Sequence, residues 1–135
     1  MLADRIVETL PNTSRAAQNL EVYRQNQNDS YRFVAESLGV LLENGNHKDV
    51  VLEVGPAQKQ FQAHRNILAA RSPVFAAMFE HDCVESRNSK VVIPDVEPEA
   101  FESLLAFIYT GKIVFENNEE VVELLQVADK VCVEI

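Results

Sequence analysis

Residues 50–63 limit the fold of this chain more than any other segment, because they have the pattern of a β-hairpin. The apolar run Val50–Val54 is typical of a strand, and Gly55-Pro56 is a turn signal. Lys59–Ala63 then returns with its apolar residues on one face. A third short strand is expected at Lys90–Ile93, which a proline ends. The other structured segments all have helical periodicity.

The clearest helix is expected from Pro98, because a proline suits the first helical position and Gly111 follows the last turn. Its apolar residues recur at helical spacing: Phe101, Leu104, Leu105 and Ile108. Asn117, with Glu120 three residues later, has the pattern of another helix start. Further helices are expected at 31–44, 65–71 and 73–81. The pattern predicts an α/β (α+β) fold with a short three-stranded sheet and a cluster of five or more helices.

The first thirty residues differ in character from the rest. Pro11 interrupts the first helical pattern, and residues 25–30 are a polar run with nothing to bury. We therefore expect 1–30 to be a leader or linker that is partly disordered and at best partly helical. Residues 31–135 are expected to form one domain, as a chain of 135 residues suggests.

Composition argues against several classes of function. The net charge of −9 disfavours binding to a phosphate backbone, which needs clustered Lys and Arg. No apolar run approaches the length of a membrane span. The two cysteines, Cys83 and Cys132, lack a disulfide pattern, which favours an intracellular location, in the nucleus, the cytoplasm or both.

Catalytic and metal-binding motifs are also missing from the sequence. The four glycines are far apart, which excludes a phosphate-binding loop, and there is no Gly-x-Ser-x-Gly turn. The three histidines, His47, His64 and His81, lack metal-ligand spacing, so we expect them to be hydrogen-bonded or solvated. We expect no enzyme activity, no metal site and no cofactor.

Two stretches carry a resemblance to a known family. They are His64–Phe79, with the run Ile67–Ser72 at its centre, and Ile108–Gly111. Together they resemble a BTB (POZ) domain over about 31–131, and Gln60–Lys112 is similar to the speckle-type POZ proteins, which pair a MATH domain with a BTB domain. From the sequence, we expect no MATH domain before this region. The chain also ends at Ile135, where family members usually continue into further helices, so we expect either a fragment truncated at its C-terminal end or a natural protein that lacks its own substrate-binding module.

The resemblance implies a protein–protein interaction module. Speckle-type relatives form homodimers and act as adaptors that bind a cullin-three E3 ubiquitin ligase scaffold and bring substrates to ubiquitination. The alternative is a BTB oligomerisation domain that recruits corepressors, or pairs with other BTB proteins, without a cullin. No substrate-binding module is evident in this chain, and an enzyme is a distant third hypothesis.

The resemblance also assigns residues to three surfaces. The dimer interface would contain Val34, Leu38, Leu41 and Ile67. The cullin-binding surface would contain Phe75, Met78, Phe79, Cys83, Glu85 and Tyr109. Within it, Cys83-Val84-Glu85 matches the family's hydrophobic-x-Glu loop motif, with a cysteine where the nearest relatives have methionine. Asp49 and Arg65 match a charged pocket beside the dimer groove.

Each assignment has a plainer alternative. The dimer residues could instead belong to the intramolecular core, although apolar residues on more than one side of the 31–44 helix favour a partner. Cys83 and Val84 could be incidental loop residues. Asp49 and Arg65, at the start of a strand and of a helix, could pair for structural reasons, which we consider the better interpretation.

Overall fold

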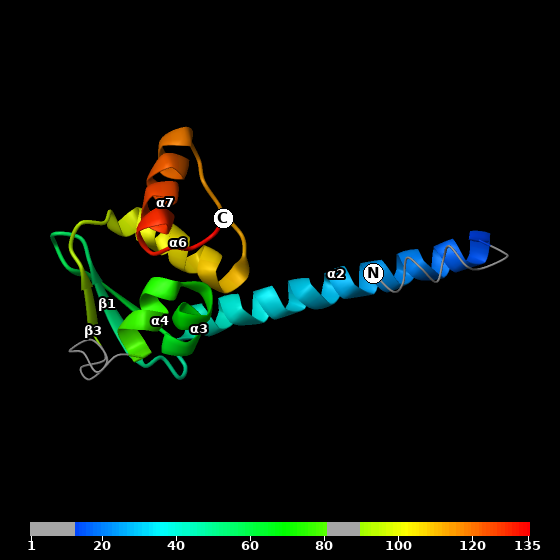
Figure 1. Cartoon of the computed structure of the whole chain (residues 1–135), viewed down its shortest axis with the longest axis horizontal. Coiled ribbons are helices and arrows are strands. Elements are labelled where there is room, and N and C mark those ends of the chain that lie inside the picture. The colour runs from blue at the N-terminus through cyan, green and yellow to red at the C-terminus, as the bar shows by residue number, and fades with distance from the viewer. Residues whose placement is uncertain (1–12, 81–89) are drawn as a thin grey trace. The chain divides into compact units, whose positions relative to one another are not determined.

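The computed structural model describes residues 13–80 and 90–135 (Figure 1). In order, the elements are α2 (Thr13–Asn44), β1 (Val50–Val54), β2 (Lys59–Ala63), α3 (Arg65–Arg71), α4 (Pro73–Glu80), β3 (Lys90–Ile93), α6 (Pro98–Thr110) and α7 (Asn118–Lys130). Five helices and three strands in these ranges confirm the predicted α/β class. The chain divides into two compact units, Met1–Ser37 and Leu38–Ile135.

The sheet has the strand order β2-β1-β3. β1 pairs antiparallel with β2, where Leu52 faces Phe61, and parallel with β3, where Leu52 faces Val91. The predicted hairpin is therefore confirmed. Gly55 makes its turn with φ +81°, and a Cβ there would lie 2.9 Å from the Pro98 ring, so both the backbone angle and the space require glycine.

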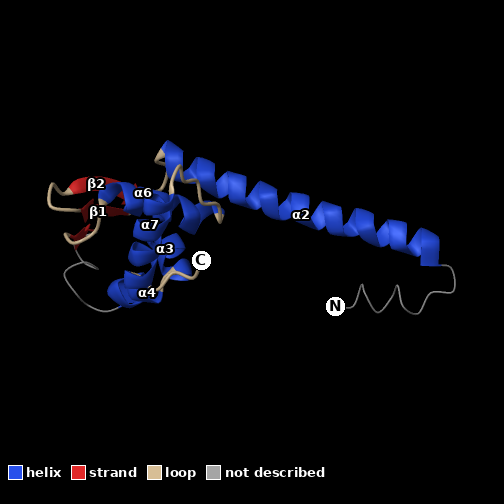
Figure 2. Ribbon diagram, turned by 90° about the horizontal axis from the view of Figure 1, so that it is seen from above, coloured by secondary structure: helices blue, strands red, loops and turns tan. Residues whose placement is uncertain are grey.

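The four described helices that follow the hairpin pack beside the sheet (Figure 2). α3 contacts both α4 and α6, and α6 contacts α7. The predicted stripe of α6 is confirmed, because Phe101, Leu104, Leu105 and Ile108 are all buried. Each such side chain contributes about 1.5–3 kcal/mol on burial, so α6 is a principal source of core stability.

The ends of the helices follow the sequence signals. The Asn117 side chain accepts a hydrogen bond from the Glu120 amide at 3.0 Å, and the Glu120 carboxylate accepts one from the Glu116 amide at 2.7 Å. Gly111 ends α6 in the left-handed conformation and donates its amide to the Phe107 carbonyl at 2.8 Å. These bonds satisfy backbone groups that a helix end otherwise leaves unpaired.

The first described helix differs from the prediction, because it begins at Thr13 rather than at residue 31. No proline or glycine interrupts residues 13–38, and the polar run 25–30 forms bonds along the helix surface. Gln25 donates to Asp29, Gln27 donates to the Tyr23 hydroxyl, Ser30 donates to the Asn26 carbonyl, and Arg32 pairs with Asp29. These side chains support a helix without being buried. Residues 1–12 of the predicted leader at 1–30 lie outside the described residues.

Amide hydrogen exchange is expected to be faster in the exposed part of α2 than in the helices of the domain. Amides of residues 25–30 should exchange far faster than those of α6, because contacts between side chains on an exposed helix are worth only about 0.2–0.5 kcal/mol each. Amide exchange followed by mass spectrometry on the full chain measures this difference. Protection of 25–30 equal to that of α6 would contradict the prediction and indicate that the segment is covered.

Candidate protein-interaction surface

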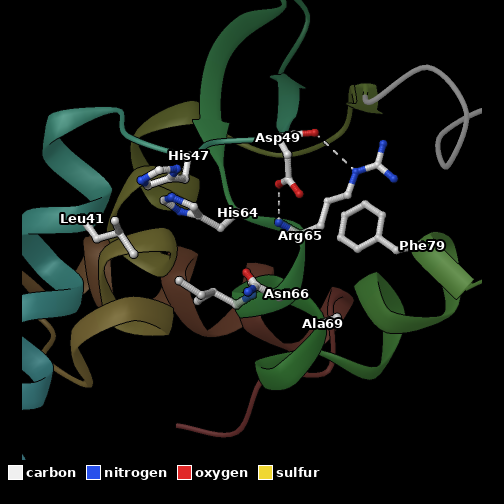
Figure 3. Close-up of a pocket in the computed structure, with 9 residues that line it drawn as sticks. Leu41, His47, Asp49, His64, Arg65, Asn66, Ala69 and Phe79 are labelled. Carbon is white, nitrogen blue, oxygen red and sulfur yellow. Dashed lines mark hydrogen bonds between the residues drawn. The ribbon is translucent and has the colours of Figure 1, made fainter.

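A hollow of about 510 Å³ opens on the domain between the end of α2 and the helices α3 and α4 (Figure 3). It is lined by Leu41, His47, Asp49, His64, Arg65, Asn66, Ile67, Ala69 and Phe79. The set joins two of the predicted dimer residues, both predicted charged-pocket residues and one predicted cullin-binding residue. The fold thus brings together residues that are separated by up to 38 positions in the sequence.

The predicted charged pair is brought together at this hollow, as Figure 3 shows. The Asp49 carboxylate accepts a hydrogen bond from the Arg65 backbone amide at 2.8 Å, and the Arg65 Nε donates to the Asp49 carbonyl at 3.3 Å. The residue before α3, His64, makes no side-chain cap, so Asp49 serves as the cap from a distant part of the chain. This geometry supports the structural interpretation of the pair.

The Arg65 side chain also covers an aromatic ring. Its guanidinium carbon lies 5.3 Å from the centre of the Phe79 ring, a distance at which a cation attracts the face of the ring. Arg65 therefore links the start of α3 to the last turn of α4. Because it contacts Asp49 and Phe79 together, it orders one wall of the hollow.

Besides the Asp49–Arg65 pair, the hollow has a second hydrogen-bonded cluster, which is formed by His64 and Tyr109. The Tyr109 hydroxyl lies 2.7 Å from His64 Nδ1 and accepts the His64 backbone amide at 2.9 Å. His64 Nε2 lies 2.8 Å from the Asn46 carbonyl, which can only accept, so Nε2 carries the proton and Nδ1 accepts from the tyrosine. Every polar group of this cluster is satisfied, and His64 is hydrogen-bonded as predicted.

Tyr109 is consequently not a surface contact, contrary to its assignment to the cullin-binding surface. Its side chain is only 2% exposed. The pattern of α6 alone placed it beside the Ile108 stripe, but its hydrogen-bond partner is 45 residues away and could not be found from local spacing. Tyr109 ties α6 to the end of β2.

Tyr109→Phe is expected to destabilise the domain by about 1–3 kcal/mol, because it leaves the His64 amide and ring nitrogen without partners. Burial raises the pKa of Tyr109, since it disfavours the phenolate. The protonated Tyr109 hydroxyl therefore contributes its full share of the folding free energy below about pH 10. This contribution is lost as the pH rises through the raised pKa of Tyr109. Urea unfolding of both chains at neutral and alkaline pH measures both effects.

Tyr23→Phe, on the exposed part of α2, is the control. At neutral pH it should change the free energy of unfolding by no more than about 0.5 kcal/mol, because it removes only the exposed hydrogen bond from Gln27. Equal stability of the Tyr109→Phe chain and the wild type would contradict the assigned hydrogen bonds.

The predicted dimer residues differ in their surroundings. Three of them are half-buried: Leu38, Leu41 and Ile67. Of these, Leu38 and Ile67 pack partly against the core. Val34 is exposed and precedes the unit that begins at Leu38. Leu38 and Ile67 thus contribute to the intramolecular core and still present apolar surface, so the dimer interface stays a prediction.

The predicted cullin-binding residues also differ from one another in their burial. Phe75 is fully buried, and its ring stacks on Phe79 with the centroids 6.1 Å apart, so it cannot anchor a partner directly. Phe75 is the residue of α4 that is buried in the core, so a direct surface contact through it does not agree with its burial. Met78 and Phe79 are half-buried. Cys83 and Glu85 lie outside the described residues.

Two further findings bear on function. Within residues 13–80 and 90–135 there is no group of three or more His, Cys, Asp or Glu side chains that could hold a metal ion. None of the helices in these ranges is both long and apolar enough to cross a membrane.

Comparison with known families identifies the domain. The family model described as BTB/POZ domain matches residues 38–134, which is well over half of the chain. The match begins where the second compact unit begins, at Leu38, and includes the hollow and the elements from β1 to α7. The chain therefore belongs to the BTB/POZ domain family, a family of protein–protein interaction modules.

Proposed function

We propose that the chain is a homodimeric adaptor that binds a cullin-three scaffold. Membership of the BTB/POZ family supports the general role, because these domains mediate self-association and contacts with protein partners. The choice of a cullin-three ligase among the possible partners rests on the proposed similarity of Gln60–Lys112 to the speckle-type POZ proteins, a similarity that the family match at 38–134 does not itself address. In this role two copies of the scaffold are held on one assembly, and the gain is avidity for substrates with several binding sites.

The observation that carries the dimer proposal is the apolar side of the hollow. Leu41 of α2 and Ile67 of α3 both line it and both remain half-buried in a single copy of the chain. Covering such side chains with a second copy removes apolar surface from water at about 25 cal/mol per Å². The proposed seam is centred on Leu38, Leu41 and Ile67.

The cullin surface is proposed at the last turn of α4. Met78 and Phe79 expose part of their surface there, and Cys83-Val84-Glu85 follows α4 in the sequence. A few large apolar residues of this kind usually carry most of the affinity of an interface. Phe75 supports this surface from the core by stacking on Phe79.

Light scattering after size exclusion tests the proposal. The chain is run alone and with a purified cullin-three N-terminal domain. We expect a dimer alone and a complex of two chains with two cullin fragments. A dimer that binds no cullin fragment would contradict the adaptor role and favour the alternative of an oligomerisation module, in which the hollow beside Asp49 and Arg65 receives a corepressor peptide. A monomer would contradict both.

A further inference from the structure

The domain has another concave surface, which lies between the start of α6, the start of α7 and the segment that joins these two helices. This α6–α7 groove encloses about 220 Å³, and its lining residues come from 99–103, 114–116 and 120–123. None of them belongs to the proposed dimer seam or to the proposed cullin surface. The groove is therefore a feature of the domain that the proposed function does not use.

Part of the groove wall is apolar and open to solvent. Val114 and Phe115 both line the groove, and they are 84% and 52% exposed. The residue before them, Ile113, packs partly against the core, so the joining segment is held on the domain with the next two side chains at the surface. Adjacent large apolar side chains that stay exposed beside a hollow commonly mark a contact with another protein.

The rest of the groove wall is strongly acidic. None of the described lining residues is basic, and four of the eight are glutamates: Glu99, Glu116, Glu120 and Glu123. Glu97 lies next to them. A hydrogen bond to Glu99 and the charge of Glu99 raise the pKa of Glu97, and the charge of Glu123 raises it further. Carboxylates from α6 and α7 are therefore close enough to repel one another.

This negative charge is not balanced within the groove. Lys59, a basic side chain near Glu99, already pairs with Glu102, whose carboxylate lies 3.8 Å from the lysine ammonium group. Glu102 is not among the residues that line the groove. A ligand that brings cations to the groove therefore relieves the repulsion, whereas a ligand that brings anions increases it.

The size and the charge of the groove select one kind of occupant. Small-molecule sites usually enclose about 300–1,000 Å³, so a groove of this size suits the side chains of a protein segment better. In the part of the chain that the structure describes, no three His, Cys, Asp or Glu side chains converge to hold a metal ion. A second copy of the chain offers no excess of cations, since it has 12 basic and 21 acidic residues.

We propose that the α6–α7 groove binds a short extended segment of a partner protein, in which arginine or lysine side chains flank one apolar residue. The apolar residue packs against Val114 and Phe115. The flanking cations pair with Glu99 on α6 and with Glu120 and Glu123 on α7, and an arginine can donate two hydrogen bonds to one carboxylate. This contact does not rest on the proposed adaptor function, so each can be tested without the other.

Fluorescence anisotropy with the full chain tests the proposal. The probe is a fluorescein-labelled peptide, Ser-Arg-Ser-Arg-Leu-Arg-Ser-Arg-Ser, at low ionic strength. We expect saturable binding that weakens several-fold as salt is added, because exposed ion pairs are screened. A peptide with serine in place of the central leucine should bind several-fold more weakly, and a peptide with glutamine in place of every arginine should not bind.

Two variants of equal net charge separate the groove from the charge of the whole chain. Glu99→Gln with Glu123→Gln should weaken binding of the probe about threefold to tenfold, since each exposed ion pair contributes little. Glu21→Gln with Glu36→Gln removes two exposed carboxylates from α2, outside the family-matched domain, and should change the affinity by less than about twofold. Glu120 is left in place because its carboxylate accepts a hydrogen bond at the start of α7.

A second pair of variants checks the apolar wall. Val114→Ser should weaken binding of the probe several-fold, and Val92→Ser, at an exposed position on β3 outside the groove lining, should not. Amide chemical shifts of the ¹⁵N-labelled chain locate the contact. Addition of the peptide should shift amides of residues 97–103 and 113–123 and leave those of α3 and α4 unchanged.

Four results would overturn the proposal. Equal affinity of the two double-glutamine variants would show that the probe responds only to net charge. The absence of binding by the wild type at low ionic strength would show that the groove takes no basic segment, and shifts confined to other residues would place the contact elsewhere. Shifts of the groove amides that appear when the chain alone is concentrated would assign the groove to a second copy.

Discussion

A chain that carries Leu38→Asp and Leu41→Asp is expected to be a folded monomer at low micromolar concentration, where we expect the wild type to be a dimer. Both side chains are half-buried in one copy, and Leu41 lines the hollow that the proposed seam covers. A carboxylate that is buried without a partner costs several kcal/mol, and two copies bring four of them to one seam. A loss of about 3 kcal/mol or more weakens the dimer at least roughly a hundredfold. Light scattering measures the mass directly.

The matched control is Val40→Asp, which places the same charge on the same helix at an exposed position between the two leucines. It should leave the dimer intact. Leu38 packs partly on the core, so Leu41→Asp alone and a circular dichroism spectrum separate dissociation from unfolding. A wild type that is already monomeric would show that the seam is assigned incorrectly.

Cys83→Glu is expected to weaken the binding of a cullin-three N-terminal fragment strongly, by roughly thirtyfold or more, without changing the fold or the dimer. The hydrophobic-x-Glu motif implies that Cys83 enters an apolar contact, and a carboxylate there must be desolvated without a partner. Loss of one such anchor typically costs about 2 kcal/mol or more, which is roughly thirtyfold in affinity. Titration calorimetry with the wild type and the variant measures the difference.

Cys83→Met is the conservative control. Methionine adds apolar area and adapts its shape, so the affinity should be retained or increased. Two outcomes discriminate between the hypotheses. If Cys83→Glu binds as tightly as the wild type, the loop motif is not the anchor. If no variant binds, the oligomerisation alternative replaces the cullin adaptor.

Local signals predicted most of the elements of the domain correctly. The hairpin at 50–63, the helix between Pro98 and Gly111 and the cap at Asn117 were all predicted from patterns within a few residues, and all three are present. Such features depend on backbone preferences and on which side chains share a face, and a few neighbouring residues determine both.

The start of α2 was predicted wrongly for a related reason. Residues 25–30 have no apolar side chain, so periodicity gives no sign of a helix there. Their helix depends on the absence of proline and glycine and on polar bonds one turn apart, such as that from Gln25 to Asp29. Hydrophobic patterning is insensitive to a helix that buries little.

The sequence by itself determined the fold class, the order of the elements and, through its resemblance, the family of this protein. Only the tertiary structure decided which residues of α4 and α6 are buried in the core and which stay partly exposed. Phe75 and Tyr109 resemble surface anchors in the linear pattern, but one stacks in the core and the other hydrogen-bonds to His64. Likewise Asp49 caps α3 from 16 residues away. These roles depend on contacts between segments that are distant in the chain, and such contacts exist only when the sheet and the helices have packed together.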